Sequence, residues 1–393
     1  MEECQRKTQD NYPLVHQYDL VEKTKEYNLE NAAKGYLPQF ALSAKASYQS
    51  DVTELPVKIP GVELKRLPKD QYQVMLELQQ KIWDGGGIRM QNKQTIAEAD
   101  VEKEKLNVDM YSLNSRVNDL YFGILLLDEQ LRQNALLQDE LGRNYRQITA
   151  YVENGIANQA DLDAVKVEQL NTQQKRVELA SLRVAYLEML SILIGEELSQ
   201  ETQLEKPVPQ NDVSAVSDIR RPELSLFNAQ GAGLQIQEKA LNVRHLPQFG
   251  LYVQGAYGNP GLNMLKNEFS PYYIAGVRLS WNFGSLYTLK NDRQVIENKR
   301  RQLNNNRDVF LFNTRLEMTQ QDQAIHSLEK QMRDDDEIIR LRTNIRKAAE
   351  AKVANGTLTV TEMLRELTNE SLARQSKTCL LYTSPSPRDS TSS

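Results

Sequence analysis

Four segments of the chain place apolar or aromatic residues at every second position, with mostly polar residues between them. The apolar positions are Phe40, Leu42, Ala44, Ala46 and Tyr48; Tyr72, Val74, Leu76, Leu78 and Ile82; Phe249, Leu251, Val253 and Tyr257; and Tyr273, Val277, Leu279, Trp281 and Phe283. A period of two predicts β-strands with one apolar and one polar face. Their length of roughly 11 to 14 residues exceeds the ~5–6 usual in soluble sheets and matches the ~9–11 that a tilted strand needs to cross a bilayer.

Each predicted pair of strands is followed by a long segment with helical spacing. From Arg89 to Tyr151, apolar residues recur alternately four and three positions apart, at Leu106, Met110, Leu113, Val117, Leu120, Ile124, Leu127 and Leu131. This seam predicts coiled-coil packing of a helix about 60 residues, or ~90 Å, long. A second helix is predicted from Tyr287 to Ala354, but glutamines and asparagines interrupt its apolar stripe. Such a stripe suits a helix that also faces a water-filled interior, and equally a loosely packed, flexible rod.

The same order of features occurs twice. The word LPQF at residues 37–40 returns at residues 246–249, the two tryptophans Trp83 and Trp281 end equivalent strands, and Asn-Gly occurs at 154–155 and 355–356. Internal repetition of this kind decides the architecture. Each half therefore reads as helix, strand, loop, strand, long helix, Asn-Gly break and helix.

The repeats divide the chain into four parts. We predict a first structural repeat at residues 1–195, an inter-repeat linker at 196–220 that contains Pro207 and Pro209, and a second repeat at 221–377 that is truncated in its last helix. Residues 378–393 abandon the helical composition for Ser, Pro and Thr. We expect them to be a non-native scar, with a native disordered tail as the alternative.

Composition narrows the class of protein. Acidic and basic residues are interleaved and sum to a net charge of -5, so no basic surface for nucleic acid is expected. No apolar run reaches the ~18–20 residues of a membrane helix. The first residues contain no apolar signal region, so we expect either that the protein stays inside the cell or that its true N-terminus is missing.

Residues with catalytic or metal-binding chemistry are sparse. The three histidines, His16, His245 and His326, are scattered without metal spacing, and the two cysteines, Cys4 and Cys379, lie near opposite ends. The glycines at 85–87 lack the Lys-Ser/Thr of a phosphate-binding loop, and we interpret them as a strand-to-helix corner. The sequence predicts no catalytic residue, no metal and no cofactor, and therefore no enzyme.

The two Asn-Gly breaks are the candidate functional positions of the helical part. Gly after Asn supplies the left-handed turn that ends one helix and lets the next pack beside it. The residues singled out are Asn154, Gly155, Asp161, Asp163, Asn355, Gly356 and Glu362. The acids are either ordinary charges at helix starts or members of carboxylate rings, contributed by several subunits, that govern passage.

Closure of the strands requires more than one copy of the chain. The smallest membrane barrels use ~8 strands, and open sheet edges are not tolerated in hydrocarbon. Four strands from each of three copies would give a barrel of about twelve. Aromatic residues at the strand ends, Tyr48, Trp83, Tyr257 and Trp281, are predicted to lie at the membrane interfaces.

Three motifs that each occur twice give the chain a resemblance to the TolC-type outer membrane efflux protein family. They are LPQF at the start of a strand, Trp-Asp/Asn-x-Gly at the end of a strand, and the Asn-Gly helical hairpin. The resemblance extends over about Asn11 to Lys377. It implies a mainly α fold with membrane β-strands, in which long antiparallel helical hairpins form an α-barrel and four strands per subunit contribute to a shared trimeric barrel of about twelve strands. It also implies a homotrimer in outer membrane lipid of a Gram-negative bacterium, extending into the periplasm as a channel-tunnel.

In that family the helix tips form an entrance gate, and acids after the hairpin glycine line it. The resemblance assigns this role to Asp161 and Glu362. The best-known members also place a Tyr and an Arg near the second tip for closing contacts, but the matching positions here hold Val353 and Leu358. That particular gate network is not expected in this chain.

Two functions from different classes follow. The first is a passive export channel of a tripartite efflux or type I secretion system. Its implied partners are a periplasmic adaptor (membrane fusion) protein and an inner membrane transporter of RND or ABC type. The alternative is a soluble coiled-coil scaffold, which the heptad seam and the missing signal region favour and the alternating strands disfavour.

Overall fold

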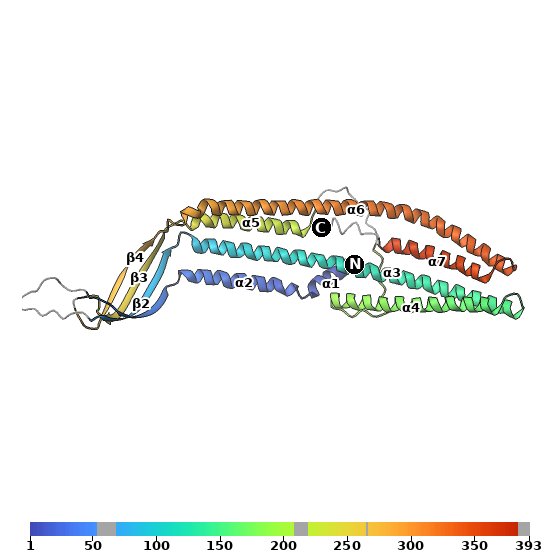
Figure 1. The fold of residues 1–393 in the computed structure, drawn as a ribbon, viewed down its shortest axis with the longest axis horizontal. Helices are drawn as coiled ribbons and strands as arrows, with labels where there is room; N and C mark the ends of the chain where they lie inside the picture. Colours follow the sequence, from blue (N-terminus) through green and yellow to red (C-terminus); the bar gives the residue numbers. More distant parts are fainter. Residues whose placement is uncertain (53–67, 208–218, 265, 384–393) are drawn as a thin grey trace, which may run out of the picture. The chain divides into compact units, whose positions relative to one another are not determined.

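A computed structural model of the chain describes residues 1–52, 68–207, 219–264 and 266–383 (Figure 1). It divides into two compact units. One, the hairpin unit, comprises Met1–Tyr18, Lys105–Ser225 and Arg307–Ser393, and the other, the strand unit, comprises Asp19–Glu104 and Leu226–Asn306. Each unit therefore combines segments of both sequence repeats.

The strand unit contains all four predicted strands, in one antiparallel sheet of order β1-β2-β3-β4. The strands are β1 (Gln39–Tyr48), β2 (Asp70–Trp83), β3 (Gln248–Asn259) and β4 (Ser270–Ser280). They are flanked by the helices α2 (Val15–Ala33) and α5 (Pro222–Val243), and they lead into α3 (Gly87–Glu153) and α6 (Leu286–Ala354). The contact of β2 with β3 joins the two repeats within one sheet.

The strand register aligns the apolar positions of all four strands on one face. Leu42 pairs with Leu76, Leu78 with Val253, and Leu251 with Val277. Because side chains alternate between faces, these pairs build a continuous apolar surface. That surface is uncovered, since Leu42 is 74% exposed and Val277 71% exposed. A soluble sheet would bury such a face.

The outer edges of β1 and β4 have no strand beside them within the described part of the chain. An edge strand presents a row of unpaired backbone N–H and C=O groups. Both edges are long, at 10 and 11 residues. The sheet is therefore incomplete along two sides.

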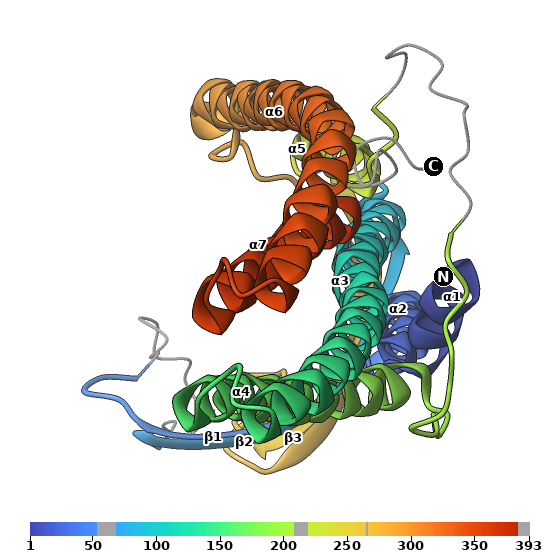
Figure 2. The same cartoon turned by 90° about the vertical axis from the view of Figure 1, so that its right-hand side faces the viewer.

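The hairpin unit is built from two helical hairpins. In both views α4 (Gln159–Ile194) runs beside the later part of α3, and α7 (Val360–Thr383) runs beside the later part of α6 (Figure 2). One apolar cluster joins α3 to α4 around Val117, Ile124 and Leu190. A second cluster joins all four helices around Ile148, Val165 and Met363.

Burial confirms the predicted seam of α3. Leu106, Met110, Leu113, Val117, Leu120, Ile124 and Leu127 are all buried, and Leu131 is half-buried. The predicted stripe of α6 is weaker, since Leu316 is exposed and Ile325 and Leu328 are half-buried. The apolar stripe of α6 is therefore less covered than that of α3 within one copy of the chain.

A short helix, α1 (Glu2–Asn11), packs against the end of α4. The Asn11 side chain donates to the carbonyls of Ile192 (3.1 Å) and Leu193 (3.2 Å), and Lys7 pairs with Glu196 at 2.8 Å. Helix ends leave carbonyls without intrahelical partners, so the Asn11 side chain provides a hydrogen-bond donor for the carbonyls at the end of α4. The N-terminal residues thus stabilise the first hairpin.

Two sequence predictions reach residues that the structure does not describe. Residues 208–218 of the predicted linker and residues 384–393 of the predicted tail lie outside the described part of the chain. Helix α7 continues to Thr383, so residues 378–383 extend the last helix. That residues 378–393 are non-native stays a prediction. None of the described helices has an apolar stretch suited to crossing a membrane.

The seam of α3 predicts a graded loss of stability. Ile124 is fully buried. We expect Ile124→Ala to lower the free energy of unfolding by about 2–5 kcal/mol and Ile124→Val by about 0.5–1.5 kcal/mol, because each leaves a cavity in proportion to its size. Unfolding in denaturant, monitored by the circular dichroism signal of the helices, measures the change in the free energy of unfolding. Glu178→Ala, in an exposed pair with Lys175, is the control and should change it by less than about 0.5 kcal/mol. Equal effects of all three variants would contradict the packing.

Candidate functional site: the hairpin turns and the two-faced sheet

The first hairpin turn ends α3 at the predicted Asn-Gly break. Gly155 has φ of +73°, its N–H donates to the carbonyl of Val152 (3.0 Å), and the N–H of Ile156 donates to the carbonyl of Tyr151 (2.8 Å). This pair of bonds is a Schellman motif, which needs a left-handed residue that glycine adopts without a Cβ clash. The Asn154 side chain adds a bond to the Ala150 carbonyl at 2.7 Å.

The second helix of this hairpin begins with a capping box. The Asn158 side chain accepts from the backbone N–H of Asp161 (3.0 Å), and the Asp161 carboxylate accepts from the backbone N–H of Asn158 (3.1 Å). Two backbone donors that the helix leaves free are satisfied reciprocally. Asp161 thus has a structural role at the start of α4. Asp163, one turn into the helix, is exposed and accepts from Gln159 at 3.0 Å.

The second hairpin turn repeats this geometry. Gly356 has φ of +68°, its N–H donates to the Val353 carbonyl (2.9 Å), and Thr357 N–H donates to the Lys352 carbonyl (2.9 Å). The Asn355 side chain donates to the Ala351 carbonyl at 2.9 Å, as Asn154 does in the first turn.

Glu362 occupies the position equivalent to Asp161. Its carboxylate accepts from the Thr359 hydroxyl (2.8 Å) and the Thr359 N–H (3.1 Å), and its own N–H donates back to the Thr359 hydroxyl at 3.2 Å. The hydrogen bonds from the Thr359 side chain and backbone lower the pKa of Glu362 from its ordinary value. The structure therefore brings together the predicted residues within each turn and gives both acids a capping role. Their action as a gate stays a prediction.

Val353 and Leu358, which hold the positions of the family's Tyr and Arg, belong to the apolar interior. Val353 is buried in the cluster that joins the four helices, and Leu358 packs against that cluster. Neither side chain can form a polar closing contact. The absence of the best-known gate network stays a prediction.

Sequence reasoning missed a charged cluster in the hairpin unit, centred on Glu370. This buried carboxylate of α7 accepts from Arg346 (2.6 Å) and Thr343 (2.8 Å) on α6 and from Arg374 (2.6 Å) one turn along α7. Arg346 also contacts Glu140 of α3 at 2.5 Å. The cluster therefore ties the two hairpins together. The Glu370 and Arg374 spacing of four was visible in the sequence, but the contacts with α3 and α6 depend on tertiary packing.

Hydrogen bonding decides the protonation of Glu370. Burial acts to raise the pKa of its carboxyl, but the bonds from the two arginines and Thr343 outweigh burial and hold the pKa below its ordinary value. Glu370 is therefore ionised, and its negative charge compensates the positive charges of Arg346 and Arg374.

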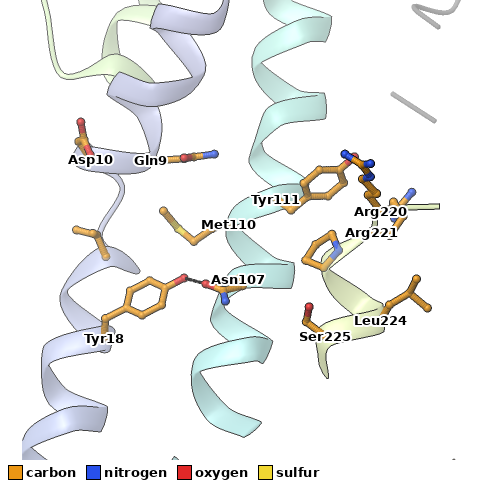
Figure 3. Close-up of a pocket in the computed structure, with 12 residues that line it drawn as sticks. Gln9, Asp10, Tyr18, Asn107, Met110, Tyr111, Arg220, Arg221, Leu224 and Ser225 are labelled. Carbon is orange, nitrogen blue, oxygen red and sulfur yellow. Dashed lines mark hydrogen bonds between the residues drawn. The ribbon is translucent and has the colours of Figure 1, made fainter. Parts of the chain in front are cut away.

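The hairpin unit also contains a cavity of about 570 Å³ between the α1–α2 junction, α3 and the start of α5 (Figure 3). The Tyr18 hydroxyl donates to Asn107 across one wall at 2.7 Å. On the other side Arg221 lies over the Tyr111 ring, 5.2 Å from its centroid, and pairs with Glu223 at 2.6 Å. The Arg221 charge is satisfied within the protein, and we interpret these contacts as packing.

In the strand unit, aromatic residues gather at both ends of the apolar face. Trp83 and Phe249 lie 5.7 Å apart between ring centroids at one end, and Tyr257 and Phe269 lie 5.7 Å apart at the other. Tyr257 and Phe249 are eight residues apart on β3, or about 26 Å at ~3.3 Å per residue. This is close to the ~25 Å apolar band of membrane barrels.

The predicted interface aromatics all lie uncovered. They are Tyr48 (77% exposed), Trp83 (42%), Tyr257 (53%) and Trp281 (52%). Their placement at a membrane interface stays a prediction, which this exposure favours.

The strand-to-helix corner predicted at the triple glycine is confirmed. The Asp84 carboxylate accepts from the backbone N–H groups of Gly86 (2.9 Å) and Ile88 (2.6 Å), which caps the start of α3. Asn282 accepts from the Gly284 N–H at 2.9 Å in the equivalent corner of the second repeat.

His245 forms a hydrogen bond with Ser285 at 2.8 Å, which is a structural contact. Among the described residues, no group of His, Cys, Asp or Glu side chains is arranged to hold a metal ion.

The chain thus combines long capped helical hairpins with a two-faced sheet whose two edges are open. Residues 7–196 match the family model of the outer membrane efflux proteins. A search of curated proteins finds no match.

The fold is shared with solved outer membrane channels over nearly the whole chain. Similar structures include the CmeC outer membrane channel of Campylobacter jejuni, with 14% identity and a TM-score of 0.68 over 99% of this chain and 83% of that one. The outer membrane protein VceC of Vibrio cholerae has 11% identity and a TM-score of 0.67 over 98% and 92%. A membrane protein from Pseudomonas aeruginosa has 12% identity and a TM-score of 0.72 over 97% and 86%.

These findings confirm the predicted resemblance to outer membrane efflux proteins and the predicted fold class of the chain. The family is one of channels, not of enzymes. In this fold the hairpin turns and the strand faces, and not a catalytic pocket, are the candidate functional surfaces.

The capping boxes predict local losses of stability at the hairpin turns. We expect Asn158→Ala or Thr359→Ala to cost about 1 kcal/mol, because each leaves helix N–H groups without an acceptor. Amide hydrogen exchange in the first turns of α4 and α7 measures the change. Asn158→Ser, which keeps an acceptor at the same place, should retain most of the protection. Unchanged exchange in the alanine variants would contradict the capping geometry.

The Glu370 cluster predicts a pH dependence. Because the pKa of Glu370 is lower in the folded than in the unfolded chain, its contribution to stability is complete above the unfolded pKa and is lost as the pH falls through the folded value. We expect Glu370→Gln to cost about 1.5–3 kcal/mol at neutral pH, since it removes a charge-assisted bond of Arg346, which keeps its contact with Glu140. The variant should also flatten the acid limb of a stability-against-pH curve, whereas an unchanged acid limb would contradict this assignment.

Proposed function

We propose that three copies of the chain form a passive conduit through the outer membrane of a Gram-negative bacterium, extending into the periplasm. The observation that carries this proposal is the register-aligned apolar face of a sheet with two open edges. In hydrocarbon each unpaired backbone group costs several kcal/mol, so the edges of β1 and β4 need partners. An even number of antiparallel strands lets β4 of one copy pair with β1 of the next.

Uncovered apolar residues on the helices support assembly with further copies. Val167, Leu170 and Val177 on α4 are 54%, 53% and 61% exposed. Val309, Phe312 and Leu316 on α6 recur three and four positions apart and are exposed as well. Such stripes are typical of helices that pack against another helix. We propose that neighbouring subunits cover them and complete an α-barrel.

We propose that acidic residues at the two hairpin turns form a gate in this assembly. Asp163 and Glu362 are exposed, and Asp161 is half-buried beside its cap. Repetition in three subunits would place rings of carboxylates around a passage, where they act on the ions that enter it. The interface aromatics Tyr48, Trp83, Tyr257 and Trp281 would anchor the sheet at the two membrane surfaces.

The partners and role follow from the family. We propose that the conduit works in a tripartite efflux or type I secretion system with a periplasmic adaptor and an inner membrane transporter of RND or ABC type, and that it performs no catalysis. The match to the outer membrane efflux protein model and the likeness to solved structures described as outer membrane channels support this role. A soluble coiled-coil scaffold, the alternative from the sequence, would leave the apolar sheet face without a cover.

A pair of adjacent substitutions tests the membrane assignment. Leu42 lies on the apolar face of β1 and Ser43 on the polar face. We expect Leu42→Lys to impair membrane assembly, because a lysine facing lipid near the bilayer midplane costs ~2–4 kcal/mol. Ser43→Lys is the matched control and should assemble normally.

The readouts are subunit number by native mass spectrometry and conductance in planar bilayers. The wild-type protein and Ser43→Lys should be conducting trimers. A monomeric, non-conducting wild type, or equal behaviour of the two variants, would contradict the proposal.

A further inference from the structure

The polar face of the sheet carries an uneven set of charges. On the described strands, the side chains that alternate with the apolar face are mainly neutral, such as Gln73, Tyr252 and Gln254. The charged members of this face are Lys45 on β1, Glu77 and Lys81 on β2, and Arg278 on β4. Three cations thus stand against one carboxylate.

Burial indicates that this polar face is the concave one. Along β3, Tyr252 and Gln254 are half-buried and Ala256 is buried, whereas Leu251 and Val253 of the apolar face are exposed. The same alternation recurs in β2 from Asp70 to Glu77. Side chains on the inner side of a curved sheet shield one another, so the polar face is the one that a closed barrel would turn inward.

The negative charge of Glu77 is already compensated by a neighbouring arginine. Its carboxylate lies 3.7 Å from the Arg278 guanidinium, and the guanidinium lies over the Tyr252 ring, 4.8 Å from its centroid. The Glu77 side chain is only 15% exposed, compared with 52% for Arg278. The single anion of this face is therefore largely screened from solvent, while its cationic partner remains accessible.

Lys45 and Lys81 make no ion pair with any described residue, and both are exposed. Lys81 also borders a polar cavity with Gln94 and Glu98, but no salt bridge joins Lys81 to Glu98. Two positive charges per copy therefore remain uncompensated on the polar face.

The register places these charges at two levels along the strands. Lys45 is level with Gln73 of β2, and Lys81 is level with Gly250 of β3 and, one strand further, with Arg278. Gln73 and Lys81 are eight residues apart, or about 26 Å along β2. Repetition around a closed barrel would turn each level into a ring of cations.

We infer that the membrane-spanning part of the conduit favours anionic solutes, meaning those that bear carboxylate, phosphate or sulfate groups. The inference rests on the proposed function, since it requires the polar face to line a passage. Rings of like charge beside a low-dielectric wall raise the local concentration of counter-ions. Salt screens charges beyond ~8–10 Å at ionic strengths of 0.1–0.15 M, so the effect is a preference and not an exclusion.

Reversal potentials in planar bilayers under a potassium chloride gradient test the inference. We expect Lys45→Gln combined with Lys81→Gln to lower the chloride-to-potassium permeability ratio by roughly threefold, as for loss of a lumen potential of about half a kT, which acts in opposite directions on the two ions. Glu77→Gln should shift the ratio in the opposite direction, because it removes the one carboxylate that the described strands place on this face. Lys45→Arg combined with Lys81→Arg keeps both positive charges and should give the same permeability ratio as the wild-type protein.

The outcomes separate this inference from the proposed function. A wild-type protein that forms no conducting assembly would overturn the conduit, and the inference with it. Conducting glutamine variants whose reversal potentials equal that of the wild type would overturn the anion preference alone, as would a Glu77→Gln shift toward potassium.

Discussion

The structure depends on the alignment of apolar residues across all four strands of a sheet whose two outer edges are open. A one-residue slip of any strand would move its apolar set to the opposite face, so the paired apolar positions make the register self-consistent. The exposed face requires an apolar solvent, and the open edges require further strands. Both requirements are met when several copies join their sheets in lipid, and neither is met by one copy in water.

The helical hairpins meet a different requirement, which is a fixed geometry at each reversal of the chain. Gly155 and Gly356 adopt left-handed conformations, and a capping box follows each of them. Asp161 and Glu362 occupy equivalent positions in the two repeats and close the same kind of cap with different residues. The Glu370 cluster then holds the two hairpins together through Arg346, which contacts both α7 and α3. The turn geometry and the contact between hairpins are therefore set by separate interactions.

Local patterns explain why much of this fold could be predicted from the sequence. The alternation in β1 to β4 and the seam from Leu106 to Leu127 depend on neighbouring residues, so β1, β2, β3 and α3 have nearly the predicted bounds. The fourth strand is the exception, because β4 ends at Ser280, before the predicted strand residues Trp281 and Phe283. The capping boxes were readable as Asn-x-x-Asp and Thr-x-x-Glu, but the acids were interpreted only as charges at helix starts or in a gate. The pairing of β2 with β3 and the contact of Glu140 with Arg346 join distant residues. Many acids and bases of this charged chain could have paired, and only tertiary packing selects among them.

The most direct test of the central claim is accessibility along β1 in the membrane-embedded protein. Single cysteines would replace residues 40–47 in turn, in a background where Cys4 and Cys379 are serine, and each would be probed with a water-soluble thiol reagent and a lipid-borne quencher. The account predicts that positions 40, 42, 44 and 46 respond to the quencher and positions 41, 43, 45 and 47 to the reagent. A uniform response along the strand, or protection of both faces from both probes, would contradict it.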